Sequence, residues 1–222
     1  DIQLGHGEPL KDTARAMGRY VDGIMARLFT HEDAEILAEY ADVPVINGLT
    51  DDAHPCQTLA DLLTIRERFD EDVQVAWVGD GNNVGQSFAV GCALAGIDLT
   101  VATPPEYPMD DRVVDRATEL GGEPDVYTDP EAAIAGADVI YTDVWVSMGE
   151  EDEREAKLAA FDGFQLNEER LAGTDAKVMH CLPAHRGEEI TDAVLESDRS
   201  IVWDQAENRL HAQKALLVEL LG

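Results

Sequence analysis

The second half of the sequence alternates short apolar runs with segments of helical periodicity, and this alternation restricts the fold more than any other feature. An apolar run at 73–78 predicts a buried strand, and a helix is predicted to follow it at 84–95. The same pattern continues, with strands at 99–102, 125–127, 139–142, 177–180 and 200–203 and helices at 111–120 and 130–135. Such alternation is typical of a parallel, doubly wound α/β sheet, which binds ligands at the carboxyl ends of its strands.

The first part of the chain shows a shorter version of this pattern. Helices are predicted at 9–21 and 31–40, and strands at 23–27 and 43–47. Pro55 suits the first position of a long helix that runs to residue 69, where a charged segment indicates a domain boundary. A last helix is predicted at 207–221, and the acidic stretch 149–155 is expected to be mobile.

The charge balance excludes some classes of partner. Asp and Glu number 46 against 16 Lys and Arg, which gives a formal net charge of -30. So acidic a surface repels a phosphate backbone, and we expect no nucleic acid partner. Carboxylates in this number also repel one another and are tolerated best where salt screens them, so the sequence predicts adaptation to high salt.

Apolar runs and cysteines indicate the compartment. No apolar run reaches the roughly 20 residues that a membrane span needs, and the chain does not begin like a signal peptide, so we expect no membrane partner and a cytoplasmic location. The three cysteines, Cys56, Cys92 and Cys181, are widely spaced and show no C-x-x-C pair. They are predicted to be reduced thiols, with no structural zinc site.

Polar clusters follow several of the predicted strands. The first candidate site is 180–186, which places two imidazoles, a thiol and a guanidinium in seven residues and could hold an anionic or carbonyl-bearing molecule. A buried cysteine beside a solvated arginine is the structural alternative. Further clusters at strand ends lie at Arg27, His54, 80–83 and 143–148. If the order of the strands permits, these clusters converge on a single cleft.

Two other functions are compatible with parts of this pattern. The turn 79–85 follows a strand and opens a helix, but its glycines stand at G-x-G-x-x-x-G and miss the dinucleotide fingerprint by one residue. Asn82 and Asn83 could there hold a zwitterionic substrate or only cap the helix. Cys181 could be a nucleophile activated by its neighbours, although the sequence identifies no separate base.

Taken together, the motifs resemble those of the ornithine carbamoyltransferases over essentially the whole chain. The segments that carry the resemblance are 12–15, 22–27, 54–57 (His-Pro-Cys-Gln), 79–83, 143–149 (Asp-Val-Trp-Val-Ser-Met-Gly), 180–183 (His-Cys-Leu-Pro) and 206–209 (Ala-Glu-Asn-Arg). This resemblance implies transfer of the carbamoyl group of carbamoyl phosphate to the δ-amine of L-ornithine, giving citrulline in arginine metabolism. It implies no cofactor and no metal.

The resemblance also implies roles for individual residues. Arg27, His54 and Cys181 are the catalytic candidates. The carbamoyl phosphate contacts are expected to be Arg27, His54, Gln57, Cys181, the main chain of Leu182, and Arg209. The ornithine contacts are expected to be Asn83, Asp143, Ser147 and the main chain of Met148.

The family organisation implies two α/β domains, of which the first is incomplete here. Residues 1–69 would be the remaining part of the carbamoyl phosphate domain, 70–205 the ornithine domain, and 206–222 a helix that returns to the first domain. The family's Ser-x-Arg-Thr-Arg phosphate loop does not occur in the 222 residues, so we expect a chain truncated at its N-terminus. The alternative is a non-catalytic, amino-acid-binding paralogue. The family further implies a homotrimer or an assembly of trimers.

Overall fold

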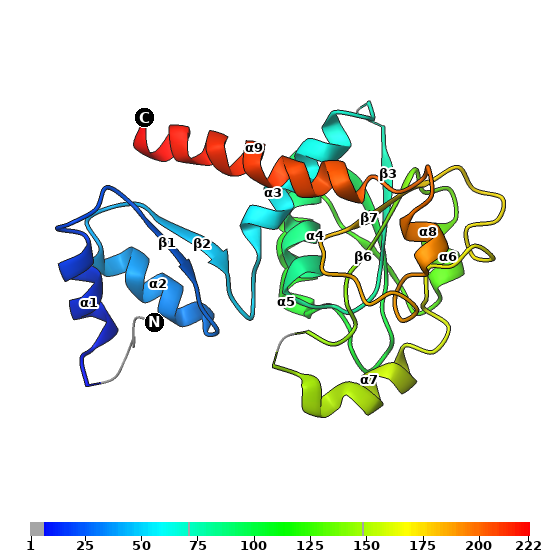
Figure 1. The fold of residues 1–222 in the computed structure, drawn as a ribbon, viewed down its shortest axis with the longest axis horizontal. Coiled ribbons are helices and arrows are strands. Elements are labelled where there is room, and N and C mark those ends of the chain that lie inside the picture. Colours follow the sequence, from blue (N-terminus) through cyan, green and yellow to red (C-terminus); the bar gives the residue numbers. More distant parts are fainter. Residues whose placement is uncertain (1–6, 71, 148) are drawn as a thin grey trace.

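The computed structural model describes residues 7–70, 72–147 and 149–222, which form two parallel sheets (Figure 1). The larger sheet has five strands in the order β5-β4-β3-β6-β7, and all of its neighbouring pairs are parallel. Its strands are β3 (Gln74–Val78), β4 (Asp98–Ala102), β5 (Asp125–Tyr127), β6 (Val139–Thr142) and β7 (Lys177–His180). In the smaller sheet, β1 (Ile24–Arg27) pairs in parallel with β2 (Val45–Leu49). The predicted α/β class is confirmed.

Alternate residues of the central strand β3 enter two separate hydrophobic cores. Val75 and Trp77 pack into a cluster that includes Phe88, whereas Ala76 and Val78 belong to a cluster that includes Phe161. Side chains alternate between the faces of a strand, so both faces of this sheet are buried. One face carries α4 (Asn83–Ala95) and α5 (Asp111–Glu119), and the other carries α6 (Pro130–Ile134), α7 (Arg154–Ala160) and α8 (Asp192–Leu195). This is the doubly wound arrangement that the alternation predicts.

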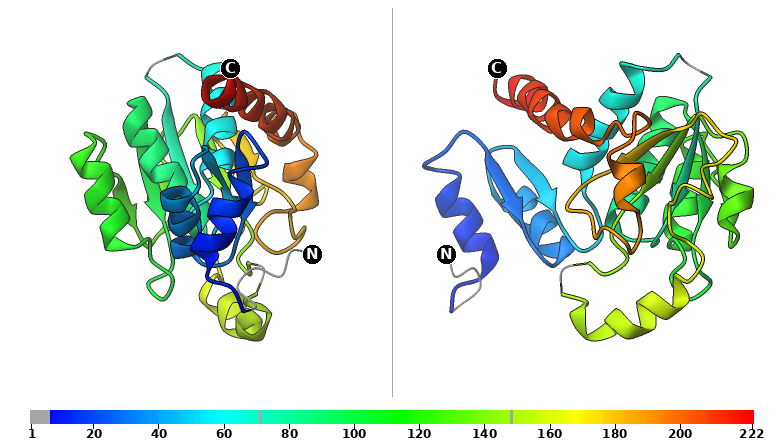
Figure 2. Two further views of the ribbon diagram at one scale, coloured as in Figure 1. Left: turned by 90° about the vertical axis from the view of Figure 1, so that its left-hand side faces the viewer. Right: turned by 45° about the vertical axis from the view of Figure 1, so that its right-hand side comes forward.

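The smaller sheet is accompanied by two helices at the N-terminal end of the chain. α1 (Leu10–Met17) packs against α2 (His31–Tyr40), which in turn contacts β2. Figure 2 shows these elements standing apart from the larger sheet. The chain passes between the two sheets through α3 (Pro55–Arg66), which contacts β2 and also packs against α4.

The last helix connects the two halves of the molecule. α9 (Val202–Leu221) lies along α3 and continues toward the smaller sheet (Figure 1). At its end, α9 comes close to β1: a Cβ placed on Gly23 would lie 3.1 Å from a methyl carbon of Leu221. No helix in the described part of the chain has the length and apolar character of a membrane span.

Two predictions about local structure are wrong. The apolar run at 200–203 is not a strand: Ser200 forms a single bridge to Val178, and α9 begins at Val202 with no side-chain cap to mark its start. The acidic stretch 149–155 contains a 3₁₀ turn (Glu151–Glu153) and the start of α7, and its expected mobility stays a prediction. The helix predicted at 9–21 ends at Met17, before Gly18. The sequence reading also missed α7 and α8. The division into domains at residue 69 stays a prediction.

Candidate active site

One cavity of about 1140 Å³ collects the predicted site residues from both halves of the chain. Its lining includes every predicted contact that the structure describes: Arg27, His54, Gln57, Asn83, Asp143, Ser147, Cys181, Leu182 and Arg209. The remaining one, Met148, lies outside the described residues. The residues that line this cavity are therefore those that were expected to converge on one cleft at the strand ends.

The topology explains why residues so far apart in sequence meet here. Arg27 is the last residue of β1, Asp143 directly follows β6, and Cys181 directly follows β7. Asn83 begins α4, close after β3. Loops at the carboxyl ends of parallel strands lie on the same edge of a sheet, and ligands bind in the crevice there.

His54 is a buried imidazole between two guanidinium groups. It precedes the first residue of α3, and its main-chain N–H donates to the Ser87 hydroxyl at 2.7 Å. Burial, followed by the positive charges of Arg209 and Arg27, lowers the pKa of His54 to about 4. The ring is therefore neutral at physiological pH, and among the described residues its buried Nδ1 has no partner. Together these three side chains present hydrogen-bond donors to an oxygen in the cavity.

Gln57 and Arg209 are joined across the two long helices. The amide oxygen of Gln57, on α3, accepts a hydrogen bond from the Arg209 guanidinium, on α9. The amide nitrogen of Gln57 points the other way and donates to Asp61 Oδ1 at 2.8 Å. Arg209 still has an unpartnered buried Nε within the described structure, so its guanidinium can bind a further acceptor.

Cys181 and Asp143 face each other at the ends of β7 and β6. The Cys181 thiol donates to Asp143 Oδ1 at 2.9 Å, and the Asn82 amide donates to Oδ2 at 2.9 Å. Burial and the nearby Asp143 charge raise the pKa of Cys181 well above its usual value. A protonated thiol is a poor nucleophile, so this geometry argues against a thiol hydrolase.

The chain turns sharply directly after Cys181. Leu182 has φ of 58°, an uncommon conformation for a residue with a side chain, and its N–H donates to His180 Nδ1 at 2.9 Å. The other ring nitrogen of His180 lies 3.0 Å from Glu189 Oε1, and both side chains are fully buried. His180 thus holds the turn in place and, unlike Cys181 and Leu182, does not line the cavity.

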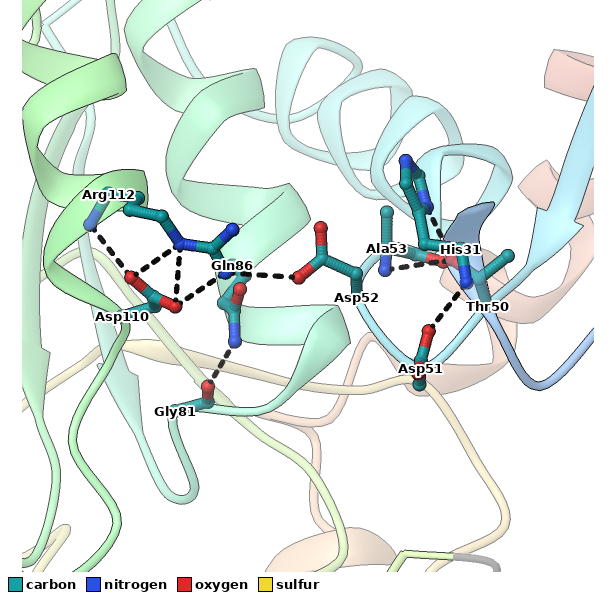
Figure 3. Close-up of polar contacts among 9 residues, drawn as sticks. All are labelled: His31, Thr50, Asp51, Asp52, Ala53, Gly81, Gln86, Asp110 and Arg112. Carbon is teal, nitrogen blue, oxygen red and sulfur yellow. Dashed lines mark hydrogen bonds and ion pairs between the residues drawn. The ribbon is translucent and has the colours of Figure 1, made fainter. Parts of the chain in front are cut away.

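The predicted amino-acid contacts are held by neighbouring loops. Asn83 donates to the main-chain oxygen of Thr50 at 2.6 Å, which fastens the start of α4 to the segment before α3. The main-chain N–H of Ser147 donates to Glu150 Oε2 at 2.9 Å. Figure 3 shows the Thr50 segment, where the Thr50 hydroxyl accepts from the N–H of Ala53 and His31 donates from its main chain to Asp51. Figure 3 also shows Arg112, which lies 3.7 Å from Asp52 of this segment.

Sequence reasoning missed a buried ionic cluster in the cavity wall. Lys157 Nζ lies 2.6 Å from Asp80 Oδ2 and 2.5 Å from Glu150 Oε2, and only 2% of its side chain is exposed. Burial raises the pKa of Asp80 to about 6, against the opposing effect of Lys157. Asp80 belongs to the 79–83 motif, but α7, which carries Lys157, has no motif that marks it.

Two groups of side chains among the described residues have metal-ligand atoms within 4.8 Å of one another: Asp143, His180 and Cys181, and His185, Glu188 and Glu189. In the first group, both His180 nitrogens already have protein partners and the Cys181 thiol is protonated. In the second, Glu188 pairs with Arg154 and Glu189 contacts His180. The first group therefore lacks the free, deprotonated donors that a metal ion needs, whereas the second keeps two atoms without a hydrogen-bond partner among the described residues, His185 Nδ1 and Glu189 Oε2.

Comparison with known proteins adds independent evidence. Residues 71–220 match the family model of the aspartate/ornithine carbamoyltransferase Asp/Orn binding domain, and residues 1–67 match that of the carbamoyl-P binding domain. The ornithine carbamoyltransferase of Haloquadratum walsbyi is 67% identical over 224 residues, covering 100% of this chain and 75% of that protein. The one from Archaeoglobus fulgidus is 55% identical over 226 residues, covering 100% and 74%.

Solved structures give the same result. Ornithine carbamoyltransferase from Pyrococcus furiosus is 52% identical and superposes with a TM-score of 0.94, covering 100% of this chain and 74% of that one. The anabolic enzyme from Campylobacter jejuni is 39% identical with a TM-score of 0.93, covering 99% and 76%. The chain thus spans about three quarters of the length of the relatives it matches.

Proposed function

Because the chain belongs to the aspartate/ornithine carbamoyltransferase family, we propose that the cavity between its two sheets is the site where it transfers the carbamoyl group of carbamoyl phosphate to ornithine. The products of this reaction are citrulline and phosphate. The observation that carries the proposal is the 67% identity to an ornithine carbamoyltransferase over the whole chain. A non-catalytic amino-acid-binding role is not favoured, because relatives named for the enzyme match throughout the length of the chain.

Carbamoyl phosphate binds, in this proposal, on the side of the cavity formed by Arg27, His54, Gln57 and Arg209. Two guanidinium groups supply the positive charge that an otherwise acidic protein needs to hold a phosphorylated substrate. His54 is neutral, so it can donate a hydrogen bond to the carbamoyl oxygen without carrying a charge of its own. Arg27 and His54 then stabilise the negative charge that develops on that oxygen during attack.

Ornithine binds on the opposite side, against Asn83, Asp143 and Ser147. An alkylamine with a pKa near ~10.4 must lose a proton before it can attack. Each carboxylate oxygen can accept more than one hydrogen bond, so Asp143 can accept from the δ-amine while it keeps Cys181 and Asn82. The neutral nitrogen forms a bond to the carbamoyl carbon, the bond from that carbon to the phosphate oxygen breaks, and phosphate leaves with the electron pair. The nitrogen then gives up its second proton, which the departing phosphate can accept.

Cys181 serves this step as a hydrogen-bond donor with no covalent role. Its raised pKa keeps the proton on sulfur, and that proton fixes the orientation of Asp143. The main chain of Leu182, the next residue, is proposed as a further contact to carbamoyl phosphate. Met148 is proposed as an ornithine contact on the sequence resemblance alone.

The setting of the enzyme is also a proposal. We infer a cytoplasmic homotrimer, or an assembly of trimers, from the resemblance to the family. Adaptation to high salt is inferred from the formal net charge of -30, because salt screens the repulsion between so many carboxylates.

A steady-state assay tests the function and the role of Arg27 together. Citrulline formation is measured with ornithine, aspartate or putrescine as acceptor, in molar salt, using the protein as its gene encodes it. We expect turnover with ornithine alone, and a loss of about 10² to 10³ in kcat/KM on Arg27→Ala. The matched control is Arg19→Ala, which removes an exposed arginine paired with Asp42. Turnover with another acceptor only, or equal effects of the two variants, would contradict the proposal.

A further inference from the structure

A buried carboxylate, Asp61, lies behind the cavity at the meeting point of three elements. It is on α3, its exposed fraction is 0%, and it does not line the cavity. Its Oδ1 accepts from Gln57 Nε2 at 2.8 Å and from Gln205 Nε2 at 2.7 Å. Its Oδ2 accepts from the Tyr141 hydroxyl at 3.0 Å. The three donors come from α3, α9 and β6, so one carboxylate joins both halves of the site.

The two glutamines extend from Asp61 to opposite sides of the reaction centre. The oxygen of Gln57 accepts from Arg209, on the carbamoyl phosphate side. The oxygen of Gln205 accepts from the main-chain N–H of His180 at 2.9 Å, directly before Cys181. Each glutamine therefore links Asp61 by hydrogen bonds to a different part of the cavity wall.

We propose that Asp61 is a positioning residue for carbamoyl transfer: it fixes the orientation of the Gln57 and Gln205 amides and so places Arg209 and the His180–Cys181 main chain. The inference rests on the proposed function, because it assigns Asp61 to the same site. Asp61 reaches the substrates only through its two neighbours and makes no contact with the cavity itself.

The physical reason is that an amide has two different ends. Gln57 could rotate so that its oxygen and nitrogen exchange places, at little cost on an exposed surface. In the buried site, such a rotation would set the amide oxygen against the Asp61 carboxylate and the amide nitrogen against Arg209. Both contacts are unfavourable where water cannot intervene. The Asp61 carboxylate therefore favours the Gln57 orientation in which the amide nitrogen faces Asp61 and the amide oxygen accepts from Arg209.

Asp61 orients the two glutamine amides whether or not its carboxyl group is protonated. Burial raises the pKa of Asp61 to about 7, against the hydrogen bonds from Gln57, Gln205 and Tyr141. Both glutamines use Oδ1 and Tyr141 uses Oδ2, so a proton on Oδ2 can be directed to the tyrosine oxygen while Oδ1 remains an acceptor. Asparagine has the same division into one acceptor end and one donor end. Asp61→Asn should consequently preserve the orientation of the glutamines, and Asp61→Ala should abolish it.

The test compares Asp61→Ala, Asp61→Asn and the control Thr64→Val. Thr64 is one helical turn further along α3, is equally buried, and accepts from Asn208 of α9 at 3.0 Å without lining the cavity. We expect Asp61→Ala to raise the KM for carbamoyl phosphate about tenfold or more, a loss of about one charge-linked hydrogen bond. The KM for ornithine should rise less, because Gln205 reaches Asp143 only through the main chain of His180 and the Cys181 thiol. Asp61→Asn should restore most of the wild-type value, and Thr64→Val should leave both KM values unchanged. Equal KM values in Asp61→Ala and wild type, no rescue by asparagine, or the same change in Thr64→Val would overturn the inference.

A second readout needs neither turnover nor a folded alanine variant. In the wild-type protein, the side-chain amide protons of Gln57 and Gln205 should be protected from solvent exchange in NMR spectra, and Asp61→Asn should retain this protection. Rapid exchange of both amides in the wild type would refute the inference. If the wild type forms no citrulline but the amides are protected, the proposed function fails while the positioning of the glutamines stands.

Discussion

Because the imidazole of His54 is buried and neutral, the free energy of unfolding should depend on pH in a specific way. Replacing it with glutamine removes a group whose pKa is about 4 in the folded protein and 6.5 as its reference value. The folded state resists protonation, so the unfolded chain binds more protons between these two values. Acidification in this pH range therefore lowers the unfolding free energy of the wild type, and this contribution from His54 should be absent in His54→Gln.

The size of the effect follows from the two pKa values. A difference of about 2.5 units, at about 1.4 kcal/mol per unit, gives a loss of about 3 kcal/mol once the pH is below both values. The loss is absent above about pH 7, and it reaches roughly 2 kcal/mol at about pH 5, where most surface carboxylates are still ionised.

Denaturant unfolding in molar salt at these two pH values measures the effect. The difference in unfolding free energy between wild type and His54→Gln should shift by about 2 kcal/mol, with the wild type losing more on acidification. The matched control is His211→Gln, which removes a half-exposed histidine of α9 that lies outside the cavity. A difference that does not change with pH would refute the claim that burial and the two arginines keep His54 neutral.

Three further predictions concern other contacts in the cavity wall. Lys157→Met leaves Asp80 and Glu150 without their buried cation and should cost about 3 to 5 kcal/mol in denaturant unfolding; a cost typical of exposed ion pairs, below about 1 kcal/mol, would contradict the burial of the cluster. Cys181→Ser keeps a donor for Asp143, so kcat should fall less than about tenfold and less than in Cys181→Ala; complete inactivation by serine would instead indicate that the thiol is a nucleophile. Asn82→Ala removes both the cap of α4, which accepts from the N–H groups of Val84 and Gly85, and one partner of Asp143, so it should cost about 1 to 2 kcal/mol and raise the KM for ornithine, whereas unchanged melting and KM would contradict both roles.

The sheet was predictable because buried parallel strands have a simple sequence pattern. β3 is apolar and buried from Val75 onward and β6 is buried throughout, and the polar residues that follow them lie at one edge of the sheet. The same pattern was misleading at 200–203, where Ile201 and Val202 are buried at the start of a helix and Trp203 is about half exposed. So short an apolar run cannot distinguish a strand from the first turn of a helix that lacks a cap.

The buried charges in the cavity wall and behind it could not be predicted, because their partners are distant in sequence. Lys157 pairs with a residue 77 positions away, and Asp61 is joined to Tyr141 and Gln205 at separations of 80 and 144. Each reads locally as a polar residue on a helix, which is usually exposed to solvent. Only the packing of α3, α7 and α9 against the sheet gives these charges their partners.

The most direct test of the account follows the carbamoyl group itself. Carbamoyl phosphate carrying labelled carbon is mixed with ornithine labelled with heavy nitrogen at the δ position, and the carbon spectrum is recorded as the reaction proceeds. We expect a carbon signal split by coupling to the δ-nitrogen, together with release of phosphate, and both should appear about 10² to 10³ times more slowly in Arg27→Ala. Labelled carbon that appears only as hydrolysis products, with no coupling to nitrogen, would contradict it.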